Sequence, residues 1–157
     1  MSLYTDKQKQ AVVKRALQAV SARQKGKQAF IAGGQTFDLE KGGFCNRFIR
    51  QVVETSLGLG AFGWYFGDAT ARATLDKLAP YALPKGAKLQ AGDIIGWYDG
   101  CGVYGHIAIY IGGEKGLIAE NTSAKRGDPR KPGTKVTRLA NCRTGWKAYR
   151  LFPVEGE

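Results

Sequence analysis

The first part of the chain carries apolar residues at helical spacing. Thr5 and Gln8 stand three residues apart, the pattern of a capping box, and the apolar face behind them is formed by Val12, Val13, Ala16, Leu17 and Val20. This pattern predicts a helix from about Thr5 to Gln24. A second apolar stripe runs through FCNRFIRQVVETSLG and stops at Gly58, where a C-cap glycine belongs. It predicts a second helix with Cys45 in its first turn.

Glycine and proline mark the segments between and after these helices. The stretch QAFIAGGQTFDLEKGG is interrupted by two glycine pairs and is interpreted as an irregular loop. Asp68 is the expected N-cap of a third helix that ends near Leu78, and Pro80 and Pro84 close this helical region.

The second half of the chain has the pattern of a β-sheet. Short segments rich in Ile, Val, Tyr and Trp are separated by Gly, Pro and Asp, and they read DIIGWY, HIAIYIGG, GLIAENTS, KVTRL and WKAYRLF. Helices followed by strands predict an α+β domain, with the helices packed on a small antiparallel, partly barrel-like sheet of about four to six strands. We expect one domain over residues 1–157, helical over about 5–80 and strand-rich over about 92–153.

Composition and charge narrow the class of protein. Of the 157 residues, 43% are hydrophobic and 24% charged, a balance typical of a folded domain. No apolar run approaches the roughly 18 residues that cross a bilayer, so no membrane insertion is expected. With 24 Lys and Arg against 13 Asp and Glu, the net charge of +11 attracts polyanions. The candidates are nucleic acid, acidic cell-wall polymers and an anionic membrane surface.

The N-terminus and the cysteines set further expectations. The polar segment MSLYTDKQKQ predicts no signal peptide, so the protein is expected to be made in the cytoplasm and exported, if at all, by a non-standard route. Three cysteines without a CxxC spacing, beside one histidine, predict no metal site. Cys101 and Cys142 flank the strand block, and the sequence leaves open whether they form a disulfide.

Cys45 is a candidate nucleophile because of its predicted place at the start of a helix. Only a thiolate attacks a carbonyl, and the N–H groups and positive dipole end of a helix N-terminus stabilise a thiolate as well as an oxyanion. A free cysteine is also often a small buried core residue. The role of Cys45 therefore depends on a partner base.

The partner base is His106, the only histidine, which opens the apparent strand HIAIYI. The isoleucines of this strand face one side and fill the core, while His106 faces the other side, which we expect the cysteine helix to cover. The next strand brings Glu120 and Asn121 to where a carboxylate or an amide can orient the imidazole. These two residues face opposite ways on a regular strand.

A helix-start cysteine, a strand-start histidine and a polar residue on the following strand resemble the papain-like cell-wall cysteine peptidases of the NlpC type and their CHAP relatives. The resemblance covers about residues 30–123. AFIAGGQTF resembles the family's aromatic-x-x-Gly-Gly loop, KLQAGDIIGWY its Gly-Asp-apolar strand, and GHIAIYIGG, the most specific match, its histidine strand. Phe30 stands where NlpC-type enzymes usually have tyrosine. The residues after Cys45, Asn46-Arg47-Phe48, are closer to the CHAP pattern.

The resemblance implies a papain-like fold and a catalytic set of Cys45 and His106 with Glu120 or Asn121, without cofactor or metal. The spacing from the histidine favours Glu120 narrowly, with Asn121 as the alternative. The candidate substrate-binding residues are Phe30, Asn46, Trp64 and Asp93. For Trp64, core or loop packing is the competing interpretation.

The implied function is a peptidoglycan hydrolase, a cysteine endopeptidase or amidase that cleaves amide bonds in cell-wall peptides. Without a signal peptide, the chain fits a phage lysin, a tail-associated hydrolase or an injected antibacterial amidase that reaches the cell wall or periplasm. Its charge favours anionic cell-wall polymers as further partners, and no specific nucleic acid is expected. The alternative is a non-catalytic basic module of the same fold that binds cell wall or nucleic acid.

Overall fold

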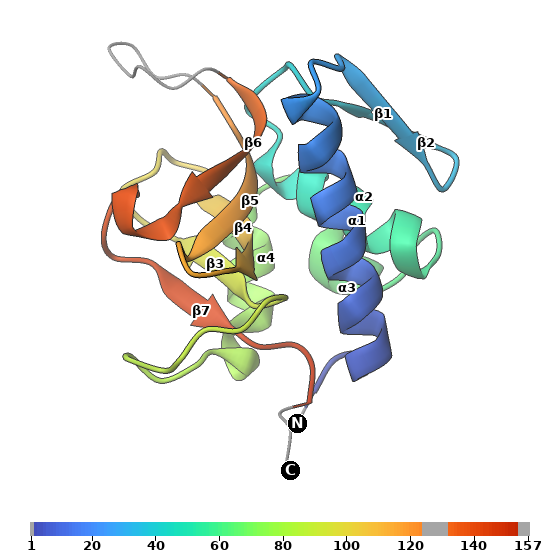
Figure 1. Ribbon diagram of the computed structural model, residues 1–157. Helices are drawn as coiled ribbons and strands as arrows, with labels where there is room; N and C mark the ends of the chain where they lie inside the picture. The colour runs from blue at the N-terminus through green and yellow to red at the C-terminus, as the bar shows by residue number, and fades with distance from the viewer. Residues whose placement is uncertain (1, 124–131, 154–157) are drawn as a thin grey trace.

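The computed structural model describes residues 2–123 and 132–153. Within them, the helices are α1 (Asp6–Gln24), α2 (Cys45–Leu57), α3 (Gly63–Phe66) and α4 (Ala71–Leu78), and the short 3₁₀ turns are η1 (Ala79–Tyr81) and η2 (Leu139–Asn141). The strands are β1 (Ala29–Ala32), β2 (Gln35–Asp38), β3 (Ile94–Trp97), β4 (His106–Gly112), β5 (Leu117–Thr122), β6 (Gly133–Arg138) and β7 (Lys147–Tyr149). The predicted α+β class is confirmed (Figure 1). None of the described helices is long and apolar enough to span a bilayer.

The second half of the chain forms one antiparallel sheet of five strands in the order β6-β5-β4-β3-β7. Each of the five predicted segments supplies one strand. The edge strands β6 and β7 do not pair with each other, so the described sheet is open and does not close into a barrel. A separate two-stranded sheet is formed by β1 and β2.

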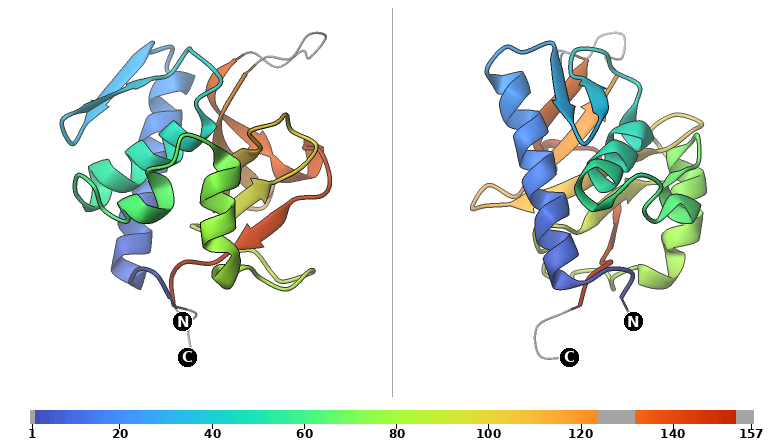
Figure 2. Two further views of the ribbon diagram at one scale, coloured as in Figure 1. Left: turned by 180° about the vertical axis from the view of Figure 1, so that it is seen from behind. Right: turned by 90° about the vertical axis from the view of Figure 1, so that its right-hand side faces the viewer.

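Both faces of the large sheet are covered. α1 and α2 pack on the face that carries Ile107 and Ile109, and α4 follows along the same side (Figure 2). The opposite face of the sheet carries a smaller core, which includes Ile95, Trp97, Ala108 and Ile118. We expected α2 to cover the face of His106, and this was wrong. The apolar side of α2 buries more surface against the isoleucines than against the small Ala108.

The segment predicted as an irregular loop is instead the β1–β2 hairpin. Gly33 and Gly34 form its two-residue turn with φ of +55° and +76°, the left-handed region that favours glycine. Phe30 and Phe37 face each other across the strands, with ring centroids 5.6 Å apart, and Phe37 is buried in the core. A glycine pair between two short segments with apolar residues is a hairpin signal that the loop interpretation overlooked.

The predicted capping box of α1 is confirmed. The Thr5 hydroxyl accepts a hydrogen bond from the Gln8 N–H at 3.1 Å, and the Gln8 side-chain oxygen accepts one from the Thr5 N–H at 2.8 Å. Because Thr5→Ala removes one of these two bonds, we expect it to lower the free energy of unfolding by about 1 kcal/mol. Urea denaturation measures the change. Ser2→Ala, just before the helix, is the control and should leave the midpoint unchanged.

The N-cap of α4 differs from the prediction. Thr70, in an extended conformation, caps this helix through a hydrogen bond from the Ala73 N–H at 3.2 Å. Asp68 instead forms a salt bridge of 2.8 Å with Lys77. The predicted cap was wrong by two residues because the sequence offers two cap-forming side chains close together.

Candidate active site

Cys45 is the first residue of α2, as the sequence predicted. Phe44 at the N-cap contributes no side-chain hydrogen bond to the first turn. The side chain of Phe44 therefore leaves the first-turn N–H groups of α2 open. These groups can stabilise a negative charge near the sulfur of Cys45. Gly42 allows the preceding segment to approach β5, since a Cβ atom at this position would collide with the backbone of Thr122.

Asn121 fixes the segment that leads into α2. Its side-chain oxygen accepts a hydrogen bond from the Phe44 N–H at 2.9 Å. Its amide nitrogen donates to the Lys41 carbonyl at 2.9 Å and to the Thr134 hydroxyl at 3.2 Å. Asn121 thus uses both ends of its amide to hold the backbone just before Cys45, and no hydrogen bond in the described part of the chain joins it to His106.

Glu120 is the residue that contacts His106. Its Oε1 lies 2.7 Å from His106 Nε2, and the two side chains are only 2% and 15% exposed. Since Nε2 is engaged by Glu120, Nδ1 is the ring nitrogen left for Cys45, whose side chain is close enough to the imidazole to help raise its pKa. Cys45, His106 and Glu120 therefore form one line of interacting side chains.

The surroundings of His106 favour its protonated form. Burial of the imidazole alone would lower its pKa, but hydrogen bonds to Cys45 and Glu120 and the charges of both groups outweigh burial and raise the pKa of His106 to about 9. The ring also lies 5.4 Å from the ring of Trp97, its partner on β3. The geometry suits an imidazolium held against the Glu120 carboxylate.

This pKa gives a testable dependence of stability on pH. Folded His106 keeps its proton up to about pH 9, whereas an ordinary histidine in the unfolded chain loses it near 6.5. The stabilisation is complete below about pH 6.5 and is lost as pH rises through about 9, on the order of 3 kcal/mol in all. Urea unfolding across this window should show the decline, and His106→Gln should remove most of it. A midpoint that rises with pH would contradict this assignment.

Asn46 and Trp64, two of the predicted substrate-binding residues, lie in different surroundings, one buried and one exposed. Asn46 is buried, and its amide donates to the Asp68 carbonyl at 2.6 Å, which ties the first turn of α2 to the segment before α4. Trp64 is 65% exposed, with the Lys77 ammonium 4.7 Å from its ring centroid. Its carbonyl accepts a hydrogen bond from the Lys77 ammonium at 2.8 Å, and Lys77 also forms the salt bridge with Asp68.

Asp93 and Phe30 are not brought to this site. Asp93 is fully buried and accepts two hydrogen bonds from the Arg150 guanidinium, at 2.9 and 2.7 Å. It precedes β3 at the end opposite Trp97, the residue that pairs with His106. Phe30 packs on Phe37 in the hairpin. The motif match around Asp93 therefore marks a structural ion pair in this chain.

The loop before His106 brings in residues that the sequence analysis did not select. Arg72 holds this loop through its Nε, which donates to the Tyr98 carbonyl at 2.6 Å, and through its backbone N–H, which donates to the Tyr104 carbonyl at 3.0 Å. Gly105 has φ of +74°. Tyr104, which is exposed, lies two positions before His106 in the chain. A glycine directly before the histidine was the available signal for a turn that presents the preceding residues.

Neither a metal cluster nor a disulfide is part of this site. Within residues 2–123 and 132–153, no three His, Cys, Asp or Glu side chains are grouped as metal ligands. No disulfide joins Cys45, Cys101 and Cys142. The chemistry that the described side chains offer is that of a thiol beside an imidazole and a carboxylate.

Comparison of the chain with protein-family models, with curated proteins and with solved structures found no match. Function is therefore inferred from the residues of this site and their geometry.

Proposed function

We propose that this chain is a cysteine peptidase or amidase of papain-like fold that cleaves amide bonds in peptidoglycan peptides. The observation that carries the proposal is the contact of one imidazole with a helix-start thiol and a buried carboxylate, Cys45, His106 and Glu120. A nucleophile, a base and a group that orients the base are the parts that covalent amide hydrolysis needs. A cysteine helix packed on an antiparallel sheet supports the fold assignment.

The reaction proceeds through a thioester. The Cys45 sulfur, with its proton on His106, attacks the amide carbonyl, and the carbonyl oxygen becomes an oxyanion near the first turn of α2. As the tetrahedral intermediate collapses, the C–N bond breaks and His106 donates its proton to the leaving amine. His106 then takes a proton from water, whose oxygen attacks the thioester. The acid product leaves and the thiol–imidazole pair is restored.

Glu120 and Asn121 have different functions in this proposal. Glu120 holds the imidazole and stabilises its positive charge through a charge-assisted hydrogen bond at 2.7 Å. Asn121 holds the backbone before Cys45 and thereby positions the nucleophile. Tyr98 and Tyr104, which are exposed on the loop before His106, offer aromatic surface for the substrate peptide.

The substrate class follows from the resemblance to NlpC-type and CHAP enzymes, and the charge of the chain agrees with it. A net charge of +11 favours adsorption to an anionic cell wall. Delivery by phage lysis, a virion or an injection system is part of the same proposal.

Digestion of purified sacculi tests the proposal. We expect the protein to release muropeptides with a newly formed amine and carboxylate, which mass spectrometry identifies together with the bond cleaved. Prior alkylation with iodoacetamide should abolish release, because it consumes the thiol. Intact muropeptides after long incubation, combined with tight binding of the protein to sacculi or to DNA, would favour the non-catalytic alternative.

A further inference from the structure

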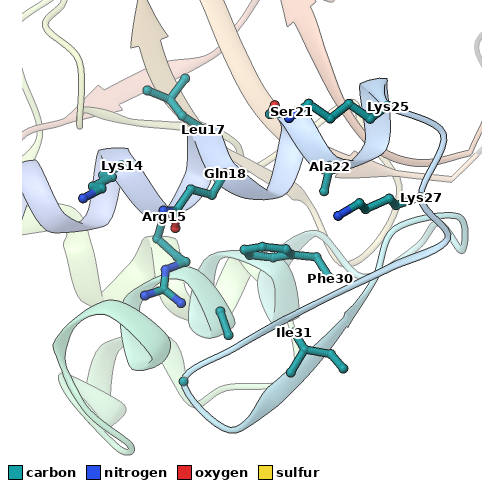
Figure 3. Close-up of a pocket in the computed structure, with 12 residues that line it drawn as sticks. Lys14, Arg15, Leu17, Gln18, Ser21, Ala22, Lys25, Lys27, Phe30 and Ile31 are labelled. Carbon is teal, nitrogen blue, oxygen red and sulfur yellow. The ribbon is translucent and has the colours of Figure 1, made fainter.

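A second feature of the molecule is a groove of about 700 Å³ between α1 and the β1–β2 hairpin (Figure 3). Its lining residues come from α1, the turn after it and β1, so it is separate from the candidate active site. Figure 3 shows the ring of Phe30 in the space between the helix and the hairpin. The apolar side chains at its rim are well exposed, with Ile31 at 73% and Leu17 at 44%.

The groove follows the edge of β1. Four consecutive residues, from Phe30 to Gly33, line it, although alternate side chains of a strand point to opposite faces. Only an edge of the strand can present successive residues to one space. Since β1 is one of the two described strands of this sheet, no other strand in residues 2–123 and 132–153 pairs with its edge away from β2.

The register of the hairpin shows which backbone groups face the groove. Ala32 and Gln35 flank the two-residue turn and form a hydrogen-bonded pair, after which bonded and non-bonded pairs alternate. Ile31 and Ala29 therefore direct their N–H and C=O groups away from β2, toward the groove. No backbone hydrogen bond to these outward groups is found in the described part of the chain.

The charge of the groove is entirely positive. Its titratable lining residues are Lys14, Arg15, Lys25 and Lys27, without any Asp or Glu. None of these four forms a salt bridge with another described residue. An edge strand next to four basic side chains is complementary to an extended peptide that carries carboxylates.

We propose that this groove binds an extended acidic segment of a partner protein, which adds to β1 as the third strand of the hairpin. The segment's backbone pairs with Ala29 and Ile31, and its carboxylates meet the cations of α1 and the following turn. Its apolar side chains, which alternate with the carboxylates, lie on the face of the hairpin that carries Ile31. A nucleic acid or a cell-wall polyphosphate has no peptide backbone for such pairing. The inference is independent of the function proposed for Cys45.

Three labelled peptides test the proposal by fluorescence anisotropy. The first alternates glutamate and valine, the second replaces each valine by proline, and the third replaces each glutamate by lysine. We expect the first to bind and the other two to bind at least about tenfold more weakly, because proline removes the pairing N–H groups and lysine reverses the charge. Addition of the first peptide should also shift the amide signals of Ala29 and Ile31 in ¹⁵N spectra.

Two pairs of protein variants locate the site. Lys14→Glu combined with Arg15→Glu should weaken binding of the first peptide by about tenfold or more, whereas Lys7→Glu combined with Lys85→Glu, exposed and outside the groove, should change it by less than about twofold. Ile31→Pro removes an N–H from the groove edge. Thr36→Pro is its matched control, because Thr36 pairs with Ile31 and points its N–H to the opposite edge of the hairpin.

Several outcomes would overturn the proposal. Equal binding of the glutamate–proline and glutamate–valine peptides would leave only attraction between opposite charges. If the Lys7/Lys85 variant lost as much peptide binding as the Lys14/Arg15 variant, the binding would likewise reflect only net charge. If Ile31→Pro and Thr36→Pro weakened peptide binding equally, strand addition at β1 would be excluded. Tighter binding of a DNA oligonucleotide or of teichoic acid to the same four cations would assign the groove to a polyanion. Failure of the first peptide to bind would refute the proposal as well.

Discussion

Replacing Cys45 by alanine, or His106 by alanine, is expected to lower kcat for muropeptide release by at least about a thousandfold. Cys45→Ala removes the sulfur that forms the thioester in the proposed mechanism. His106→Ala removes both the group that takes the thiol proton and the group that protonates the leaving amine. The measurement is the rate of release from purified sacculi, with the two variants purified separately.

The controls separate chemistry from folding. Cys101→Ala removes a thiol outside the line of interacting side chains and should retain activity. Neither Cys45 nor His106 contributes a large core side chain, so both variants should unfold cooperatively in urea. Because the two residues act as one unit, the double variant should lose no more activity than either single variant. Undiminished release by folded Cys45→Ala would place the chemistry at another residue.

The helices α1, α2 and α4 and the large sheet followed from the sequence because their signals are local, whereas the short helix α3 was not predicted. The capping box at Thr5 and the apolar stripe of α2 each depend on residues a few positions apart, and both elements formed where predicted. The β1–β2 hairpin was missed because its glycines were interpreted only as breaks in the chain. Their positive φ is what makes a two-residue turn between strands.

Side-chain partners were harder to predict because they depend on distant contacts. The pairing of Asp93 with Arg150 joins residues 57 positions apart and turned a motif residue into part of a buried ion pair. The side of β4 covered by α2 could not be read from alternation alone, since both faces of that strand are buried. Cys45 and His106 nevertheless interact, and each is the first residue of its element.

The choice between Glu120 and Asn121 illustrates the same limit. A one-residue change of register on β5 reverses which side chain faces His106. Spacing from the histidine favoured Glu120 only narrowly. The contact that distinguishes the two residues is the 2.7 Å approach of Glu120 to the imidazole, while Asn121 points to the segment before Cys45.

Glu120→Gln is therefore expected to lower kcat by about a hundredfold or more, and Asn121→Ala to act mainly on stability. Glutamine keeps the shape of the side chain but removes the negative charge that helps to hold the pKa of His106 at about 9. The pKa of His106 should fall, and the imidazolium signal in NMR spectra should titrate at lower pH. Glu120→Gln therefore tests the effect of the negative charge, because the size and shape of the side chain stay the same.

Asn121→Ala leaves the Phe44 N–H, the Lys41 carbonyl and the Thr134 hydroxyl without the partner that all three share. The expected cost is about 1–3 kcal/mol of folding free energy, with the titration of His106 unchanged because its contacts with Cys45 and Glu120 remain. If Asn121→Ala instead shifted that titration and Glu120→Gln did not, the amide would be the orienting group and the carboxylate a structural one. Measuring kcat, the His106 titration and urea unfolding on both variants distinguishes these assignments, since positioning the nucleophile and charging the base affect different observables.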